Sequence, residues 1–169
     1  MLRLSDLPAR SSEIFLARVA ALGLSPALWE PAGVVASGWD REPPNSFHGE
    51  GVGWSKGTFF YRSDAEMHGF AHEVGHAAQL SPEAWAELDV RDPRTSEDVA
   101  LLIQVEICRG IPGLGTGRML SEMADADYCF MGLRADEVDA EEWWWEVVPR
   151  TMQDEHAAVM AVATRWRAA

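Results

Sequence analysis

The stretch His72-Glu73-Val74-Gly75-His76 combines residue types that can bind a metal ion and move a proton. In an α-helix, residues four apart lie about one turn apart on the same face. Two imidazoles at this spacing can bind one ion, and a glutamate that follows the first of them lies beside it. Zinc sites of this H-E-x-x-H form use both histidines as ligands and the glutamate as a general base. The alternative is an ordinary helix with two surface histidines.

The residues around this stretch predict the helix that it needs. Ser63 and Glu66 have the spacing of a capping box, and no proline follows until Pro82. Apolar residues recur at intervals of three and four, which predicts a buried stripe beside the histidines: Met67, Phe70, Ala71, Val74, Ala77 and Ala78. The small side chains of Gly75 and Ala77 leave room there for close packing.

A catalytic zinc ion usually has three protein ligands and keeps one position for water, so the pattern requires a third ligand. Glu122 is the first choice. Its predicted helix carries apolar residues on a neighbouring face, which would direct the carboxylate toward the core: Met119, Met123 and Ala126. Asp125 lies nearly on the same side and could accept an N–H from a ligating histidine.

Glu106 is the main rival of Glu122. It shares a predicted helix face with apolar residues: Val99, Leu102 and Ile103. A buried carboxylate needs a partner, and a metal ion is one such partner. Asp125, Asp127 and His48 are further alternatives, as is the absence of a third protein ligand.

Other polar residues could border the same site. His68 lies one turn before His72. His68 and His76 would be ~12 Å apart along a helix axis, so the three histidines cannot all reach one tetrahedral ion. We therefore expect His68 at the rim. Tyr61, His68 and Tyr128 are candidates for stabilising an oxyanion.

The composition predicts one globular domain that spans all 169 residues. A net charge of −13 opposes binding to nucleic acids or anionic membrane surfaces. Cys108 and Cys129 form no C-x-x-C motif, so we expect buried free thiols rather than a disulfide framework. No apolar run approaches the ~20 residues of a membrane span, and no signal peptide is recognisable at the N-terminus. These observations favour the cytoplasm.

The remaining pattern predicts an α+β, mostly helical fold with a small antiparallel sheet ahead of the metal-binding helix. Residues 51–54 and 58–61 flank Ser55-Lys56-Gly57 as the arms of a hairpin, whose edge could pair with an extended peptide. The other predicted elements are a helix over 11–23, a turn with a short helical piece over 25–31, a strand over 33–36, a loop over 40–49, helices that begin near Ser81 and Thr95, and helices over 118–131, 136–148 and 151–166.

The block Ala71-His72-Glu73-Val74-Gly75-His76 resembles the A-H-E-x-G-H form of the zincin superfamily of metallopeptidases, in particular small bacterial or phage zincins of the gluzincin type. Residues 121–129 are loosely similar to the glutamate-bearing helix of antirestriction-type and repressor-cleaving zincins. The resemblance implies a zincin-like fold and zinc-dependent hydrolysis of a protein or peptide substrate. It also implies His72, His76 and Glu122 as ligands and Glu73 as general base.

The chain departs from two zincin subgroups. The sixth residue after His76 is Pro82, so the third histidine of metzincins is absent. Ala126 stands where the larger gluzincins carry an aspartate. No DNA-binding domain is visible beside the zincin-like region, which argues against an antirestriction role.

Trp143-Trp144-Trp145 supports a second hypothesis. Three consecutive tryptophans cannot all face one side of a helix, so we expect at least one of them at a surface. An exposed tryptophan there could bind a protein partner. The chain would then be a non-catalytic, regulatory or immunity protein on the same scaffold.

Overall fold

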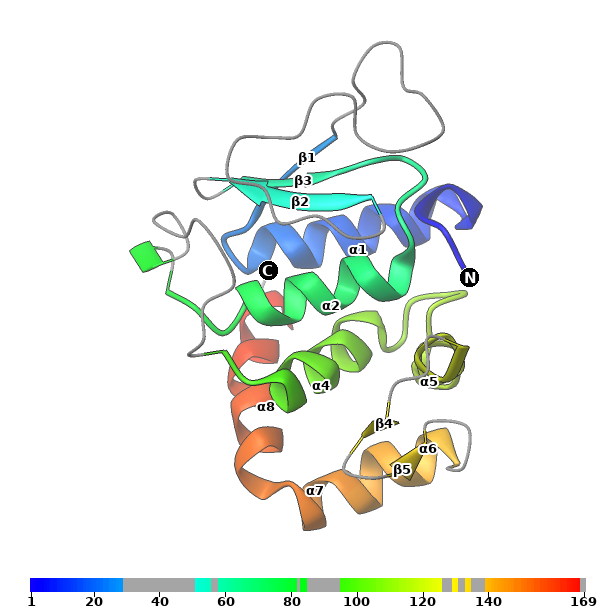
Figure 1. Ribbon diagram of the computed structural model, residues 1–169, viewed down its shortest axis with the longest axis vertical. Coiled ribbons are helices and arrows are strands. Elements are labelled where there is room, and N and C mark those ends of the chain that lie inside the picture. Colours follow the sequence, from blue (N-terminus) through cyan, green and yellow to red (C-terminus); the bar gives the residue numbers. More distant parts are fainter. Residues whose placement is uncertain are drawn as a thin grey trace.

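The computed structural model describes residues 1–28, 51–55, 58–81, 83–84, 95–125, 129–130, 133–134 and 139–167. A small sheet lies at one end of the molecule, and the helices lie on one side of it (Figure 1). The expectation of a mostly helical α+β fold is confirmed. The predicted strand over 33–36, the loop over 40–49 and most of the helix near Ser81 fall outside the described residues.

The sheet has the strand order β1-β3-β2, with β3 in the centre. Strands β2 (Val52–Ser55) and β3 (Thr58–Tyr61) are antiparallel, as the hairpin pattern predicted. Strand β1 (Ser25–Leu28) pairs parallel to β3, so the sheet is mixed and the predicted turn and helical piece at these residues are wrong. Pro26 lacks an N–H group, which suits the edge position of β1 among the described strands.

Aromatic side chains join the sheet to the two helices packed against it, α1 (Ala9–Ala21) and α2 (Met67–Ala77). The Phe70 ring stacks on Phe59 at 5.4 Å and meets the edge of Phe15 at 5.0 Å between centroids. Tyr61 stacks on the same ring at 5.4 Å. Phe70 therefore fixes α2 between β3 and α1.

Helix α2 begins at Met67 rather than at the predicted capping box, because the N-terminal segment occupies its start. Leu2 accepts a hydrogen bond from the N–H of Met67 at 2.9 Å, and Arg3 forms a β-bridge with Glu66. Glu66 precedes α2 as its N-cap residue without a side-chain hydrogen bond. All 11 residues of α2 are buried, including the whole H-E-x-x-H stretch.

Helix α4 (Glu97–Cys108) packs against α2 through the centre of the molecule (Figure 1). Ser96 caps its N-terminus, and the Ser96 side chain accepts a hydrogen bond from Val99 N at 3.3 Å. The helix start predicted near Thr95 is thus confirmed. Every residue from Val99 to Cys108 is buried. Cys108 is a free thiol, as expected; the side chain of Cys129 lies outside the described part.

The C-terminal half is helical but divided differently from the prediction. Helix α5 (Thr116–Asp125) ends early, and the short strands β4 (Cys129–Phe130) and β5 (Leu133–Arg134) follow it as an antiparallel pair. The last elements are α6 (Ala140–Glu142), the π-helix η3 (Trp143–Val147), α7 (Val148–Thr151) and α8 (Gln153–Arg167). No described helix is long and apolar enough to cross a membrane.

The π-helix coincides with the three tryptophans and ends at Val147, two residues before Pro149. Proline has no N–H group, so it cannot bond the carbonyl of Trp145 as a regular α-helix would require. Within the π-helix, the N–H of Val148 bonds the carbonyl of Trp143, five residues back, rather than that of Trp144, four residues back. Trp143 and Trp144 are buried, whereas Trp145 is 56% exposed, which confirms that at least one tryptophan lies at the surface.

Candidate metal centre

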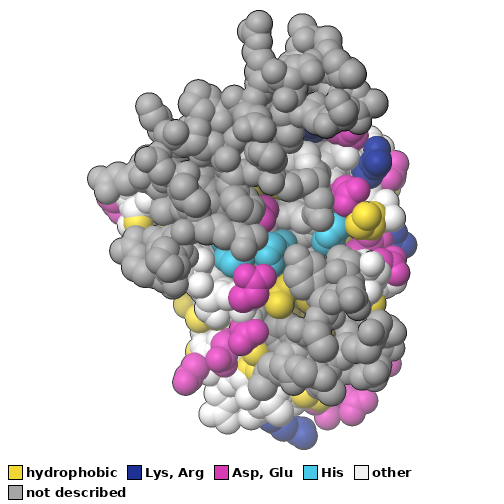
Figure 2. All heavy atoms as spheres, in the orientation of Figure 1, with side chains coloured by type: hydrophobic (Ala, Val, Ile, Leu, Met, Phe, Trp, Pro, Cys, Tyr) yellow, Lys and Arg dark blue, Asp and Glu magenta, His cyan; other side chains and the backbone are white. Residues whose placement is uncertain are grey.

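Two helices bring three potential metal ligands together. His72 and His76 come from α2, and Glu97 comes from the first turn of α4. The two Nε2 atoms are 3.1 Å apart. Nε2 of His72 lies 3.1 Å from Oε1 of Glu97, and Nε2 of His76 lies 3.2 Å from Oε2 of the same carboxylate. Figure 2 shows histidine side chains in the middle of one face, beside acidic side chains.

The spacing of these donor atoms fits a divalent ion. Zinc lies about 2.0–2.1 Å from its nitrogen and oxygen ligands, so neighbouring donors of a tetrahedral site are about 3.3 Å apart. The 3.1 Å between the two Nε2 atoms is close to that value, and each histidine has one oxygen of Glu97 at 3.1 or 3.2 Å. Glu97 offers both of its oxygens to the histidines, and its side chain is 54% exposed. One side of the group is therefore open to water or a substrate.

Close packing of α2 on α4 allows Glu97 to reach the histidines. A β-carbon added to Gly75 would lie 2.4 Å from the carbonyl oxygen of Ala100 and 2.9 Å from its α-carbon. Real side chains do not approach backbone atoms this closely, so only glycine permits the observed contact. The small residue between His72 and His76 on α2 thus sets the separation of the helices.

Thr95 contacts the ring nitrogen of His76 that does not face Glu97. Its hydroxyl oxygen lies 3.2 Å from Nδ1 of His76. When the ring proton is on Nδ1, this N–H can donate a hydrogen bond to the hydroxyl oxygen, and Nε2 keeps its lone pair for a metal ion. The sequence reasoning missed Thr95 in this role, because it had identified this residue only as the start of a helix.

Glu73 follows His72 on α2, and only 7% of the residue is exposed. A carboxylate at this position of a metal-binding helix is placed to exchange protons with water next to the ion. His68, one turn earlier, is 1% exposed, so the expected rim position is wrong. Tyr61 is half-buried in the aromatic cluster, and this burial raises the pKa of its hydroxyl group.

The structure brings Glu97 to the histidines, whereas the Glu122 carboxylate contacts Leu2 and Arg118. Oε2 of the buried Glu122 accepts a hydrogen bond from the backbone N–H of Leu2 at 2.9 Å, and the carboxylate forms an ion pair with Arg118. These contacts satisfy the buried charge without a metal ion.

Glu106, the rival ligand, is also buried, and two arginines pair with it. Arg109 Nε lies 2.7 Å from one carboxylate oxygen, and Arg167 contacts the other. Asp125 is exposed at the end of α5. The remaining alternatives, Asp127 and His48, and the oxyanion candidate Tyr128 lie outside the described residues.

Glu97 had one signal in the sequence. It belongs to the acidic first turn of a predicted helix that follows the metal-binding helix along the chain. Acidic residues are common in first turns because they interact favourably with the helix dipole, so the position alone did not identify a ligand.

Comparison with known proteins adds no family to this geometry. No protein-family model matches the chain. No curated protein and no solved structure matches it either. The resemblance to zincins therefore stays a prediction, and the functional argument depends on the site itself.

Proposed function

We propose that the protein is a zinc-dependent peptidase of the zincin type. The observation that carries this proposal is the convergence of His72, His76 and Glu97 beside the buried Glu73. Two imidazoles and one carboxylate, with one position left for water, form a donor set used by catalytic zinc. The high acidic charge of the chain also favours a cation, with 27 acidic against 14 basic residues.

Each residue has a separate part in the proposed reaction. When bound, zinc supplies Lewis acidity that lowers the pKa of a water molecule and polarises a peptide carbonyl. His72, His76 and Glu97 hold the ion. Glu73 removes a proton from the attacking water and delivers it to the leaving amine as the C–N bond breaks. The products are a carboxylic acid and an amine, so the hydrolysis consumes one water.

Replacing Glu73 with glutamine tests this assignment. The amide keeps the size of the side chain but cannot accept the proton, so cleavage of a peptide library should cease while zinc stays bound. Glu13→Gln, at an exposed position of α1, is the matched control and should retain activity. Substantial cleavage by the Glu73→Gln variant would show that another group is the base.

A second function is favoured by Trp145, which is exposed although Trp143 and Trp144 are buried. Its Nε1 donates to Glu141 at 3.0 Å, and the Arg109 guanidinium lies 4.4 Å from the ring centroid. A flat aromatic surface held in place in this way suits a protein partner. Zinc binding without hydrolysis of any library peptide would favour this non-catalytic function.

Neither function requires a nucleic acid or a membrane, and a cytoplasmic location stays a prediction.

A further inference from the structure

The side chain of Gln79 connects the metal-binding helix to the residue that precedes Glu97. Its Nε2 donates to the carbonyl of Gly75 at 3.1 Å and to the carbonyl of Ser96 at 3.0 Å. Its Oε1 accepts a hydrogen bond from the backbone N–H of Ser96 at 2.8 Å. One amide group thus bonds both backbone polar groups of the residue that caps α4.

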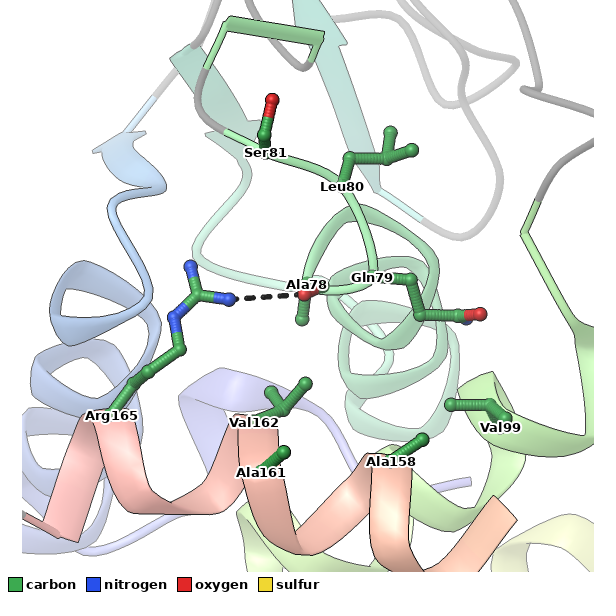
Figure 3. A pocket seen from close by; sticks show the side chains of 9 residues that line it. All are labelled: Ala78, Gln79, Leu80, Ser81, Val99, Ala158, Ala161, Val162 and Arg165. Atoms are coloured by element: carbon green, nitrogen blue, oxygen red, sulfur yellow. Dashed lines mark hydrogen bonds between the residues drawn. The ribbon is translucent and has the colours of Figure 1, made fainter. Parts of the chain in front are cut away.

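Gln79 also completes the end of α2. The last four carbonyls of a helix lack partners within the helix, and Gly75 belongs to this last turn. Gln79 lies just beyond the helix, after Ala78. Figure 3 shows its side chain on the Val99 side of a groove between the end of α2 and α8, pointing away from Arg165. The amide therefore faces α4 rather than α8.

Ser96 stands between the two residues of its segment that touch the histidines. Thr95 contacts Nδ1 of His76 at 3.2 Å, and Glu97 lies 3.1 Å from His72 and 3.2 Å from His76. A shift of Ser96 along α2 would therefore displace both contacts together. The packing of Gly75 on Ala100 sets how far apart the helices lie at that point, within a contact that runs along both helices. The Gln79 hydrogen bonds hold the chain at Ser96, the residue just before α4 and next to both Thr95 and Glu97.

We propose that Gln79 is a positioning residue, which holds the Thr95-Ser96-Glu97 segment so that the third ligand is in place before the metal ion binds. This inference rests on the proposed metal centre. Residues that orient metal ligands typically change metal affinity by roughly 10–100-fold when they are replaced. Gln79 should act within this range, although it does not itself touch the ion.

Two substitutions separate the parts of this contact. Gln79→Leu removes all three hydrogen bonds at a similar side-chain size. Gln79→Glu keeps an acceptor for the N–H of Ser96 but faces the carbonyls of Gly75 and Ser96 with a carboxylate oxygen. Both variants should bind Zn²⁺ roughly 10–100-fold more weakly than the wild type in competition with a chromophoric chelator. Gln153→Leu, at an exposed position of α8, is the control and should bind as the wild type does.

Gln79→Leu in a Glu97→Gln background shows whether Gln79 acts through the third ligand. If it does, Gln79→Leu should cost much less affinity there than in the wild type, because coupled residues are not additive. An equal loss in both backgrounds would overturn the proposal, as would wild-type affinity in either single variant. Gln79→Glu decides the point if Gln79→Leu does not fold. A wild-type protein that takes up no Zn²⁺ would contradict the metal centre itself, whereas unchanged affinity in the variants contradicts only the role of Gln79.

Discussion

Nε2 of His72 and Oε1 of Glu97 lie 3.1 Å apart, although the two residues belong to different helices. The second oxygen of the same carboxylate lies 3.2 Å from His76. The relative position of α2 and α4 therefore determines the proposed metal centre.

Glu97→Gln and Glu122→Gln should affect different properties of the protein, the first zinc affinity and the second stability. Loss of the Glu97 charge should weaken Zn²⁺ binding by about 100-fold or more, because a ligand is replaced by a poorer one. Glu122→Gln should leave zinc affinity near the wild-type value but lower the free energy of unfolding by about 1–3 kcal/mol, through its contacts with Leu2 and Arg118. Chelator competition and urea unfolding measure the two effects. The reverse pattern would identify Glu122 as the third ligand.

Gly75→Ala should separate α2 from α4, because the new β-carbon would lie 2.4 Å from the carbonyl oxygen of Ala100. Overpacking of this kind typically costs about 1–3 kcal/mol, and a backbone atom cannot move aside as a side chain can. We expect a loss of at least about 2 kcal/mol in urea unfolding, together with weaker zinc binding. Gly117→Ala is the matched control on α5, where the added carbon would lie 3.7 Å from the nearest atom. It should be neutral or slightly stabilising.

Thr95→Val should lower zinc affinity by about 10-fold, because the methyl group that replaces the hydroxyl cannot accept a hydrogen bond from the N–H at Nδ1 of His76. Thr95→Ser retains the hydroxyl group and should restore most of the affinity. The measurement is chelator competition on folded variants. Equal losses in the valine and serine variants would mean that the hydroxyl contact at 3.2 Å does not orient the ring.

Removal of metal should destabilise the protein, because an ion that binds only the folded state contributes to the free energy of unfolding. At a free zinc concentration of 100 times Kd, this contribution is about 2.7 kcal/mol. Chelation should therefore lower Tm, and added zinc should restore it. In His72→Ala both the zinc content and the response of Tm to zinc should be lost. A Tm in the wild type that does not respond to zinc would contradict a metal centre in the folded state.

Cys108 should be unreactive in the folded protein. Burial raises the pKa of its thiol far above the usual value, and only the thiolate reacts with alkylating reagents. Iodoacetamide should therefore label Cys108 only after unfolding, as read by peptide mass spectrometry.

The same shift in pKa gives a dependence of stability on pH. The folded thiol keeps a proton that the unfolded thiol loses above about pH 8.5, so the free energy of unfolding should fall as the pH rises beyond that point. Cys108→Ala should remove this part of the decrease. Rapid labelling of the folded protein would contradict the burial of Cys108.

Features that depend on neighbouring residues were predictable from the sequence. The spacing of His72 and His76 places both imidazoles on one helix face, because the pitch of the α-helix is fixed. The start of α4 near Thr95 and the arms of the hairpin follow from residue types a few positions apart. The pairing of β1 with β3 and the bridge that replaces the capping box did not follow, because both depend on segments far away in the chain.

The amino-acid sequence by itself determined the two imidazoles, the adjacent carboxylate and the helix that carries them. Tertiary structure alone decided which acidic residue, among those that the structure describes, lies beside them. Glu122 and Glu106 are buried, as a ligand could be, but arginines pair with both carboxylates. Glu97 looked like an ordinary first-turn residue until the packing of α4 on Gly75 brought it to the histidines. The physical reason is that helix geometry acts within one turn, whereas the third ligand depends on how two helices pack.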